Sequence, residues 1–404
     1  MTDPRLRWHV AVCLFLATVI NYVDRQTLSV LAPVLSDELK ITNLEYSYMV
    51  QAFLIPYTFM YVPAGILIDR WGTRAGLTVS MAFWSVATAL HATASNARHL
   101  MLYRFLLGVG ESGNFLAAEK AVSEWYPPKE RGVANGLINA AAGVGAILAP
   151  PLVVWIWHLF GWRFAFVSTG LLGLVWIAPW WWVYRRPPPA ALHSERLPYT
   201  ALLRHSQSWG LLFARVLADP VWWFYLFWLP KYLKEDRGFS MAEIGMLSWI
   251  PYVAADAGSV LGGMLSGRLV RRRDPIPARR LAMWPCVLLM PLGVGIAFTP
   301  SVALAMALIC LATFCHMAWK TNLMTLTNDV YPPGILASAA GLVGLGGGLG
   351  GAIAAPVFGT LIDAFSYTPV FIILGFLHPA AMLLVHCTVR KPICEPSPVS
   401  VVRA

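Results

Sequence analysis

Charged residues are scarce in this chain. Aspartate, glutamate, lysine and arginine make up 12% of its 404 residues, whereas soluble domains average about 25%. No phosphate-binding glycine loop with a following lysine occurs, so ATP-driven activity has no support, and no nucleophile elbow suggests a serine hydrolase. The six cysteines show no metal-ligand spacing. We therefore expect a protein that is not an enzyme and that uses neither a cofactor nor a metal.

Hydrophobic residues, in contrast, make up 58% of the chain and occur in long runs. A helix needs roughly 20 apolar residues to cross the hydrocarbon core of a bilayer. Twelve runs of about this length are present, at 8–33, 46–68, 76–94, 99–122, 133–157, 163–184, 209–233, 242–268, 280–298, 301–326, 335–362 and 368–389. The sequence therefore predicts an all-α polytopic membrane protein with twelve transmembrane helices.

The formal net charge is +10, but the basic residues do not gather on a soluble domain, so no nucleic-acid partner is expected. They concentrate on one side of the predicted spans, as at Arg185-Arg186 and Arg271–Arg273, while the opposite loops hold few. Because short cytoplasmic loops carry the excess of lysine and arginine, both termini are predicted to be cytoplasmic. No cleavage site follows the first apolar run, which is predicted to be a span and not a removed signal peptide.

A polar stretch with a proline run lies near the middle of the chain and separates two halves. An internal repeat supports this division, because Gly136-Leu137 recurs as Gly341-Leu342, and Ala149–Pro151 resembles Ala354–Pro356. Two related halves around a midplane cavity form a standard transporter architecture. The predicted organisation is two pseudo-symmetric six-helix bundles, at residues 1–185 and 209–390. A cytoplasmic linker at 186–208 joins them, and a cytoplasmic tail follows at 391–404.

Four ionisable residues interrupt the apolar runs, namely Asp24, Arg25, Arg104 and Glu111. A charge at the bilayer centre costs roughly 2.5–3.5 kcal/mol on insertion scales, so such residues usually face a cavity and pair with a partner or ligand. Arg104 and Glu111 are seven residues apart, which is close to two helical turns, so both can project into one cavity. One interpretation is that the arginines hold an anion and the carboxylates carry a proton. The other is structural salt bridges between two helices.

The loop between the second and third runs, residues 65–74, reads Gly-Ile-Leu-Ile-Asp-Arg-Trp-Gly-Thr-Arg. An acid at one helix end with bases beside it can make charge-assisted contacts to neighbouring helix ends. The loop resembles the cytoplasmic signature of the major facilitator superfamily, which helps to hold the outward-open state together. The resemblance implies the fold of that family and gate roles for Gly65, Asp69, Arg70, Gly72 and Arg74. A merely solvated turn is the alternative.

A narrower resemblance is carried by residues 104–115 and 123–131, together with Asn21–Arg25 and Ala218–Pro220. These segments resemble the anion:cation symporter branch of the superfamily, and within it the bacterial hexuronate transporters. Arginine's planar fork suits a carboxylate, and tyrosine can bind sugar hydroxyls. The resemblance implies substrate binding by Tyr22, Arg25, Tyr57 and Arg104. It implies proton binding by Asp24 and Glu111.

The tenth apolar run contains a polar segment from His316 to Asn322. A lysine inside the membrane calls for a functional hypothesis by the same cost argument. Lys320 is predicted to bind a second substrate carboxylate or to counter an acid, with His316 one turn earlier and Asn322 as further candidate substrate ligands. Packing residues are the alternative for the histidine and the asparagine. Lys320 is no signature of the family, which leaves the identity of the substrate open.

These observations together predict a secondary active transporter of the bacterial inner membrane. The expected activity is alternating-access symport of a proton with a sugar-acid anion, a hexuronate such as glucuronate or galacturonate. The alternatives are an organic-anion exchanger, a symporter for an aldonate, aldarate or other carboxylate, and a transporter-like membrane sensor. The expected partners are the small anion, the proton as coupling ion and the lipid bilayer, and the protein is expected to be a monomer.

Overall fold

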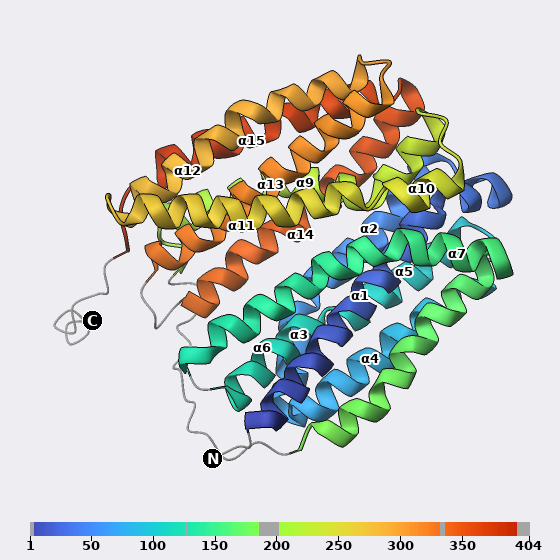
Figure 1. The fold of residues 1–404 in the computed structure, drawn as a ribbon, viewed down its shortest axis with the longest axis horizontal. Coiled ribbons are helices and arrows are strands. Elements are labelled where there is room, and N and C mark those ends of the chain that lie inside the picture. The colour runs from blue at the N-terminus through green and yellow to red at the C-terminus, as the bar shows by residue number, and fades with distance from the viewer. Residues whose placement is uncertain (1–3, 127, 186–201, 332–335, 394–404) are drawn as a thin grey trace. The chain divides into compact units, whose positions relative to one another are not determined.

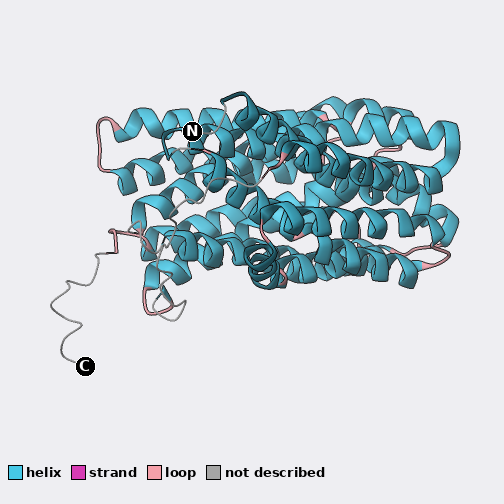
Figure 2. Cartoon of the chain, turned by 90° about the horizontal axis from the view of Figure 1, so that it is seen from below, coloured by secondary structure: helices cyan, strands magenta, loops and turns pink. Residues whose placement is uncertain are grey.

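The computed structural model describes residues 4–126, 128–185, 202–331 and 336–393. These residues are almost entirely helical and contain no strand, as Figure 2 shows. The predicted linker and tail lie mostly outside the described residues. The helices before the linker are α1 (Pro4–Leu39), α2 (Asn43–Phe59), α3 (Tyr61–Trp71), α4 (Thr73–Leu90), η1 (His91–Thr93), α5 (Ala97–Glu111), α6 (Gly113–Trp125) and α7 (Pro128–Val183). Those after it are α9 (Ser206–Glu235), α10 (Met241–Leu247), α11 (Ile250–Val270), α12 (Pro275–Leu289), η2 (Met290–Ala297), α13 (Val302–Val330), α14 (Leu336–Ala364) and α15 (Thr368–Thr388).

The helices correspond to the predicted membrane spans. Nine helices in the described ranges are long and apolar enough to cross a membrane, or ten when α2 and α3, bent by 47° against each other, count as one. Helix α7 contains two predicted spans, since Gly161 breaks it with φ 82° and ψ 168°, a conformation that needs glycine. Helices α5 and α6 cover the fourth run with its charged residues. The prediction of an all-helical membrane protein is therefore confirmed.

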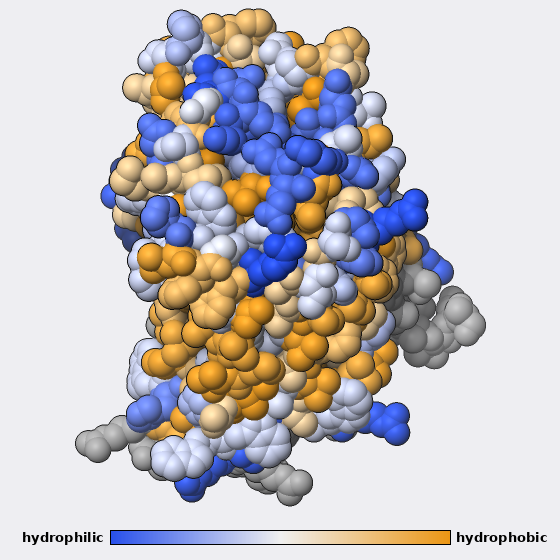
Figure 3. Space-filling view, turned by 90° about the vertical axis from the view of Figure 1, so that its right-hand side faces the viewer, coloured by the Kyte–Doolittle hydropathy of each residue, from blue (hydrophilic) through white to orange (hydrophobic). Residues whose placement is uncertain are grey.

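Large apolar side chains remain exposed on the surface. Trp155 is 61% exposed, Phe160 61% and Leu288 71%. On the face in Figure 3, hydrophobic side chains form continuous areas beside patches of hydrophilic ones. Soluble monomers rarely expose apolar surface on this scale, so these side chains are suited to contact with lipid.

The backbone contacts divide the chain into two compact units. Unit 1 comprises residues 1–191, 223–253 and 351–370, and unit 2 comprises 192–222, 254–350 and 371–404. Unit 1 therefore combines the helices before the linker with the C-terminal part of α9, with α10 and with the end of α14 (Figure 1). The prediction of two six-helix halves joined at the linker stays a prediction.

A proline in α9 ties that helix to α1 and α2 within unit 1. Pro230 has no N–H, so the carbonyl four residues earlier, at Leu226, loses its helical donor. The hydroxyl of Ser29 donates to this carbonyl at 2.9 Å and to that of Phe227 at 2.8 Å. Tyr46 also donates to the Phe227 carbonyl, at 2.5 Å. These bonds fix the position of the Phe227 side chain, which lies beside Arg104.

Close packing of α5 on α2 depends on the absence of a side chain at Gly108. A Cβ built there would lie 2.9 Å from Pro56 Cγ and closer still to the Phe53 carbonyl oxygen. We expect Gly108→Val to lower the free energy of unfolding by about 1–3 kcal/mol through overpacking, measured as a lower thermal midpoint in detergent. Gly263→Ala is the control, since its Cβ would meet Thr321 at an ordinary 3.8 Å. Equal midpoints for the two variants would contradict the packing argument.

Candidate functional site

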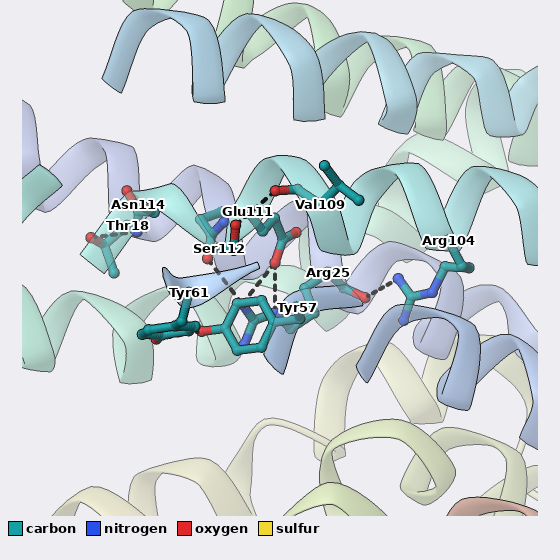
Figure 4. Close-up of polar contacts among 10 residues, drawn as sticks. Thr18, Arg25, Tyr57, Tyr61, Arg104, Val109, Glu111, Ser112 and Asn114 are labelled. Carbon is teal, nitrogen blue, oxygen red and sulfur yellow. Dashed lines mark hydrogen bonds and ion pairs between the residues drawn. The ribbon is translucent and has the colours of Figure 1, made fainter. Parts of the chain in front are cut away.

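A buried ion pair joins Arg25 of α1 to Glu111 at the end of α5 (Figure 4). Both Nε and Nη2 of Arg25 donate to Oε2 of Glu111, at 2.9 and 2.7 Å. Nη2 also reaches the side-chain oxygen of Asn21, at 3.3 Å. The other oxygen of Glu111, Oε1, is buried without a hydrogen-bond partner among the described residues. The carboxylate thus uses one oxygen for the arginine and leaves one unsatisfied.

Aromatic rings surround the Arg25 guanidinium. Its Cζ lies 4.7 Å from the ring centroids of both Tyr22 and Tyr57 and 5.0 Å from that of Phe53. A guanidinium within about 6 Å of a ring centroid is attracted by the ring's negative face. The hydroxyl of Tyr57 lies 3.3 Å from that of Tyr61 (Figure 4). The structure therefore brings three predicted site residues, Tyr22, Tyr57 and Glu111, around Arg25.

Arg104 lies beside this pair on α5 and is completely buried. Its Nη1 donates to the Arg25 backbone carbonyl at 3.2 Å (Figure 4), and its Cζ lies 4.8 Å from the Phe53 ring and 5.3 Å from the Phe227 ring. Its Nε and Nη2 have no acceptor in the part of the chain that the structure describes. Buried donors are normally satisfied, so Arg104 offers two unused donor nitrogens on a planar cation.

The Phe53 ring lies close to both buried guanidiniums, and Phe53 was not predicted as a site residue. Its ring lies within 5.0 Å of Cζ in both Arg25 and Arg104. A phenylalanine in an apolar helix carries no sequence signal that distinguishes it from a packing residue. Its ring attracts both cations.

Asp24, the neighbour of Arg25 in sequence, has different surroundings. The polar side chains beside it are those of Trp84 on α4 and Thr169 on α7. Its exposed fraction is 1%, and neither of its oxygens has a hydrogen bond of normal geometry within the described ranges. The two predicted proton sites, Asp24 and Glu111, therefore have separate polar neighbours.

The predicted residues of the second half lie in unit 2. The ring of His316 on α13 stacks on that of Trp222 from α9, with centroids 6.0 Å apart, and its Nδ1 lies 3.2 Å from Nε2 of His378 on α15. Nζ of Lys320 is 5.9 Å from the Trp222 ring centroid. Lys320 and His316 thus share an aromatic neighbour. His378, which was not predicted as a site residue, contacts His316.

Asn322 has a partly structural role in the same unit. Its amide nitrogen donates to the carbonyls of Gly262 at 3.1 Å and Ala318 at 2.8 Å. The first of these bonds joins α13 to α11. Only its buried side-chain oxygen remains without a partner among the described residues, so a ligand can use Asn322 as an acceptor but not as a donor.

A second buried ion pair, Arg215 with Asp219 on α9, was missed. Nε and Nη2 of Arg215 donate to Oδ2 of the aspartate at 2.8 and 2.5 Å. The charges of both residues also act on Lys320. Opposite charges four residues apart inside an apolar run were the available signal, because such residues meet on one face of a helix.

The predicted gate residues are only partly described. Gly72 joins α3 to α4 with φ 82° and ψ 157°, which explains a glycine there. Arg70 is exposed, and the side chain of Asp69 lies outside the described residues. A Cβ on Gly65 would find ordinary space, 3.9 Å from the nearest atom, so the packing there does not require glycine.

Arg74 and Glu124 contact neighbouring helix ends at the end of unit 1 that contains the predicted gate residues. Arg74 at the start of α4 donates to the carbonyl of Trp181 near the end of α7, and its Cζ lies 4.1 Å from that residue's ring centroid. Glu124 near the end of α6 accepts hydrogen bonds from Thr73, at 2.9 Å, and from the Tyr184 hydroxyl. Glu124 belongs to the segment 123–131 that carries the family resemblance, but it was not predicted as a contact between helices.

Comparison with known proteins identifies the family. Residues 14–355 match the model of the Major Facilitator Superfamily. The chain belongs to this superfamily. Similar major facilitator proteins include the hexuronate transporter of Escherichia coli strain K12, 32% identical over 415 residues and 96% of each chain. The galacturonate transporter of Dickeya chrysanthemi is 33% identical over 324 residues, which cover 74% of this chain and 94% of that one.

The solved structures agree on the major facilitator fold. A bacterial homologue of the human lysosomal transporter Spinster, in an inward-facing and unoccupied conformation, superposes with a TM-score of 0.79. The match covers 96% of each chain at 19% sequence identity. It therefore supports the fold alone, and the predictions of a superfamily member that is not an enzyme are confirmed by the family and its relatives.

The Arg25–Glu111 pair makes a testable prediction about stability. Arg25→Met leaves Glu111 buried without its counter-ion, and breaking a buried pair in this way costs about 3–5 kcal/mol. We expect this variant to have a much lower thermal midpoint in detergent than the wild type. The double variant Arg25→Met/Glu111→Leu should recover most of the loss, because no buried charge is left unpaired.

The surface pair Arg163–Glu38 provides the control. Its side chains are 54% and 45% exposed, and exposed pairs contribute about 0–1 kcal/mol, so Arg163→Met should change the midpoint little. A double variant as unstable as Arg25→Met alone would show that the unpaired charge is not the cause.

Proposed function

We propose that this protein is a proton-coupled symporter of a sugar-acid anion, a hexuronate such as glucuronate or galacturonate. The observation that carries the proposal is the pair of buried arginines. Glu111 is paired with Arg25, while two donor nitrogens of Arg104, Nε and Nη2, lack an acceptor among the described residues. A substrate carboxylate supplies such an acceptor in a charge-assisted, bidentate geometry. The hexuronate and galacturonate transporters among the relatives support a sugar acid.

Coupling follows from competition for Arg25. While Glu111 is ionised, its Oε2 accepts both hydrogen bonds from the Arg25 guanidinium. A proton on Glu111 removes the negative charge and weakens this pair, which frees Arg25 for the substrate carboxylate. Protonation of Glu111 and anion binding therefore favour each other, and such reciprocal coupling is what symport requires.

In the proposed cycle, protons bind Asp24 and Glu111 from the periplasm and the anion binds Arg25 and Arg104. Tyr22 and Tyr57 bind its hydroxyls. Charge neutralisation in the site permits closure, and the two predicted six-helix halves rock to release proton and anion on the other side. Both termini are cytoplasmic in this scheme, and a monomer in the bacterial inner membrane carries out the cycle.

His316, Lys320 and Asn322 are proposed as further substrate ligands. Lys320 supplies a further cation, His316 lies beside the same Trp222 ring, and Asn322 offers its free acceptor oxygen. This excess of cations favours a second candidate substrate, an aldarate with a carboxylate at each end. An organic-anion exchanger is the other alternative, since it needs the arginines but no titrating carboxylate.

Gate roles are proposed for Gly65, Asp69, Arg70, Gly72 and Arg74. The support is the contact of Arg74 with the end of α7 and the neighbouring Glu124 cluster, which joins α4, α6 and α7. Such contacts between helix ends stabilise the closed inner side, and they must rearrange before the substrate can leave.

The coupling role of Glu111 is tested with Glu111→Gln in proteoliposomes. Glutamine keeps a side-chain oxygen as acceptor for Arg25 but cannot take up a proton. We expect substrate accumulation driven by an inward proton gradient to fall at least about tenfold. Counterflow, which exchanges labelled for unlabelled substrate without net proton movement, should persist. Initial rates of both processes are measured with radiolabelled glucuronate.

Glu38→Gln, which alters a half-exposed surface carboxylate, serves as the control and should behave like the wild type in both assays. Undiminished gradient-driven accumulation in Glu111→Gln would remove Glu111 from the mechanism. A wild type that performs counterflow but never accumulates substrate against a gradient would favour the exchanger.

The substrate is tested by thermal shift with uronates, aldonates and aldarates. A ligand present at 100 times its Kd stabilises the folded state by about 2.7 kcal/mol. We expect a hexuronate to give the largest shift. Lys320→Met should weaken hexuronate binding about tenfold, and aldarate binding more, because a second carboxylate then loses its cation.

Lys391→Met, which changes an exposed lysine, is the matched control and should leave every shift unchanged. Wild-type affinity in Lys320→Met would exclude Lys320 as a substrate ligand. An aldarate that stabilises the wild type most strongly would replace the hexuronate as the substrate.

A further inference from the structure

A line of buried polar side chains runs along α4 toward Asp24. Ser85, Thr88 and His91 recur every three residues, so they lie on one side of the helix and its end, and Trp84 directly precedes them. All four are at most 1% exposed. Each has a polar side-chain atom without a hydrogen-bond partner in the described part of the chain. Buried polar atoms are usually satisfied, so a run of four requires an explanation.

His91 forms the outer end of this line. Its Nδ1 lies 2.8 Å from the Ala87 carbonyl oxygen, and since a carbonyl only accepts, Nδ1 carries the proton in the neutral ring. Nε2 is then a free acceptor, buried and without a partner among the described residues. The ring stacks on Phe166 of α7 with centroids 4.9 Å apart, which fixes its orientation.

The surface is close to His91. The Tyr103 ring of α5 covers it at a centroid distance of 5.7 Å, and the Tyr103 hydroxyl lies 3.0 Å from that of the exposed Thr93. Thr93 belongs to η1, directly after α4. Tyr103 therefore contacts both His91 and the exposed Thr93.

The inner end of the line is Asp24. Trp84 and Thr169 are its polar neighbours. The seven steps from Trp84 to His91 span about 10 Å along the helix axis at a rise of about 1.5 Å per residue. A series of a few hydrogen-bonded groups can span this distance.

Helix α7 covers the line with small residues. A Cβ on Gly170 would lie 3.0 Å from the Ala89 nitrogen, and one on Gly173 would meet the Ser85 hydroxyl. Thr169 is on the same stretch of α7 and completely buried. The groups in the line are thus enclosed by protein within unit 1, and the Arg25–Glu111 pair has a separate set of neighbours.

We propose that His91, Thr88 and Ser85 form a proton route from the periplasmic side to Asp24, separate from the path of the anion. The inference rests on the proposed function, in which Asp24 binds a proton. It explains why two carboxylates are needed: Glu111 responds to the anion at Arg25, while Asp24 exchanges its proton through α4.

The chemistry of each group suits its place in the route. His91 takes a proton at Nε2 and releases it from the same atom, since Nδ1 remains bound to the Ala87 carbonyl. The hydroxyls of Thr88 and Ser85 each donate one proton while they accept another, with internal water spanning longer gaps. The Trp84 indole only donates, so it transfers no proton.

Charged and titratable groups near the two ends come from several helices. Tyr103 and Arg104 of α5 act on His91, and Glu111 acts on Asp24. Glu111 couples the proton at Asp24 electrostatically to the anion site.

The route is tested with Thr88→Val, which preserves shape and removes the hydroxyl. Proton entry is followed with a pH-sensitive dye inside proteoliposomes after addition of glucuronate. We expect the initial rate of substrate-driven proton entry to fall about tenfold or more. Counterflow and the pH dependence of substrate binding should remain within about twofold of the wild type, because the equilibrium protonation of Asp24 and Glu111 is unchanged. His91→Phe, which keeps the stacked ring, should give the same pattern.

Thr327→Val is the matched control, since Thr327 is buried and its hydroxyl is bonded within its own helix, to the Leu323 carbonyl. It should leave all three measurements unchanged. If proton entry is normal in both Thr88→Val and His91→Phe while Asp24→Asn cannot accumulate substrate, the route is wrong. The proposed function of Asp24 would still stand in that case. Loss of counterflow together with proton entry in Thr88→Val indicates a structural role and also overturns it. Wild-type accumulation in Asp24→Asn refutes the role of Asp24 in the proposed function.

Discussion

The buried guanidinium of Arg25 is the constraint on which the rest of the site depends. An arginine cannot lose its charge in a protein, so α1 can hold it in the membrane only if other helices compensate the charge. Glu111 does so from α5, and the rings of Tyr22, Phe53 and Tyr57 surround it. In the proposed function, the same compensation makes Glu111 responsive to any anion that competes for Arg25. The interaction that stabilises the fold would then also couple proton and substrate.

Backbone details bring the helices close enough for this arrangement. A Cβ on Gly145 of α7 would lie 2.6 Å from Tyr22 Cβ, so glycine allows α7 to approach α1 at the level of the site. Pro230 releases a carbonyl in α9, and Ser29 of α1 satisfies it. The resulting contact holds Phe227 against Arg104. Residues that look like ordinary packing or helix breakers therefore position the charged groups.

The sequence predicted the positions of the helices better than it predicted which side chains contact one another. The twelve apolar runs correspond to the helices because each run must satisfy its backbone hydrogen bonds internally in lipid, and this requirement is local. The four ionisable residues were noticeable for a similarly local reason, the cost of a charge in an apolar run. Phe53, Phe227 and His378 were not predicted, since their roles depend on which side chains of other helices lie beside them. The roles of the predicted residues in transport stay proposals.

Asp24 and Arg25 illustrate which properties of a residue the sequence predicts and which it does not. Composition alone determined that both lie in a membrane span, because any charge in such a run is expensive wherever the helix packs. Adjacent residues on a helix point about 100° apart, so each faces different helices, and no local pattern states which. Only the tertiary structure decided that Arg25 meets Glu111 among aromatic rings while Asp24 meets Trp84 and Thr169, because those contacts depend on how α4, α5 and α7 pack around α1.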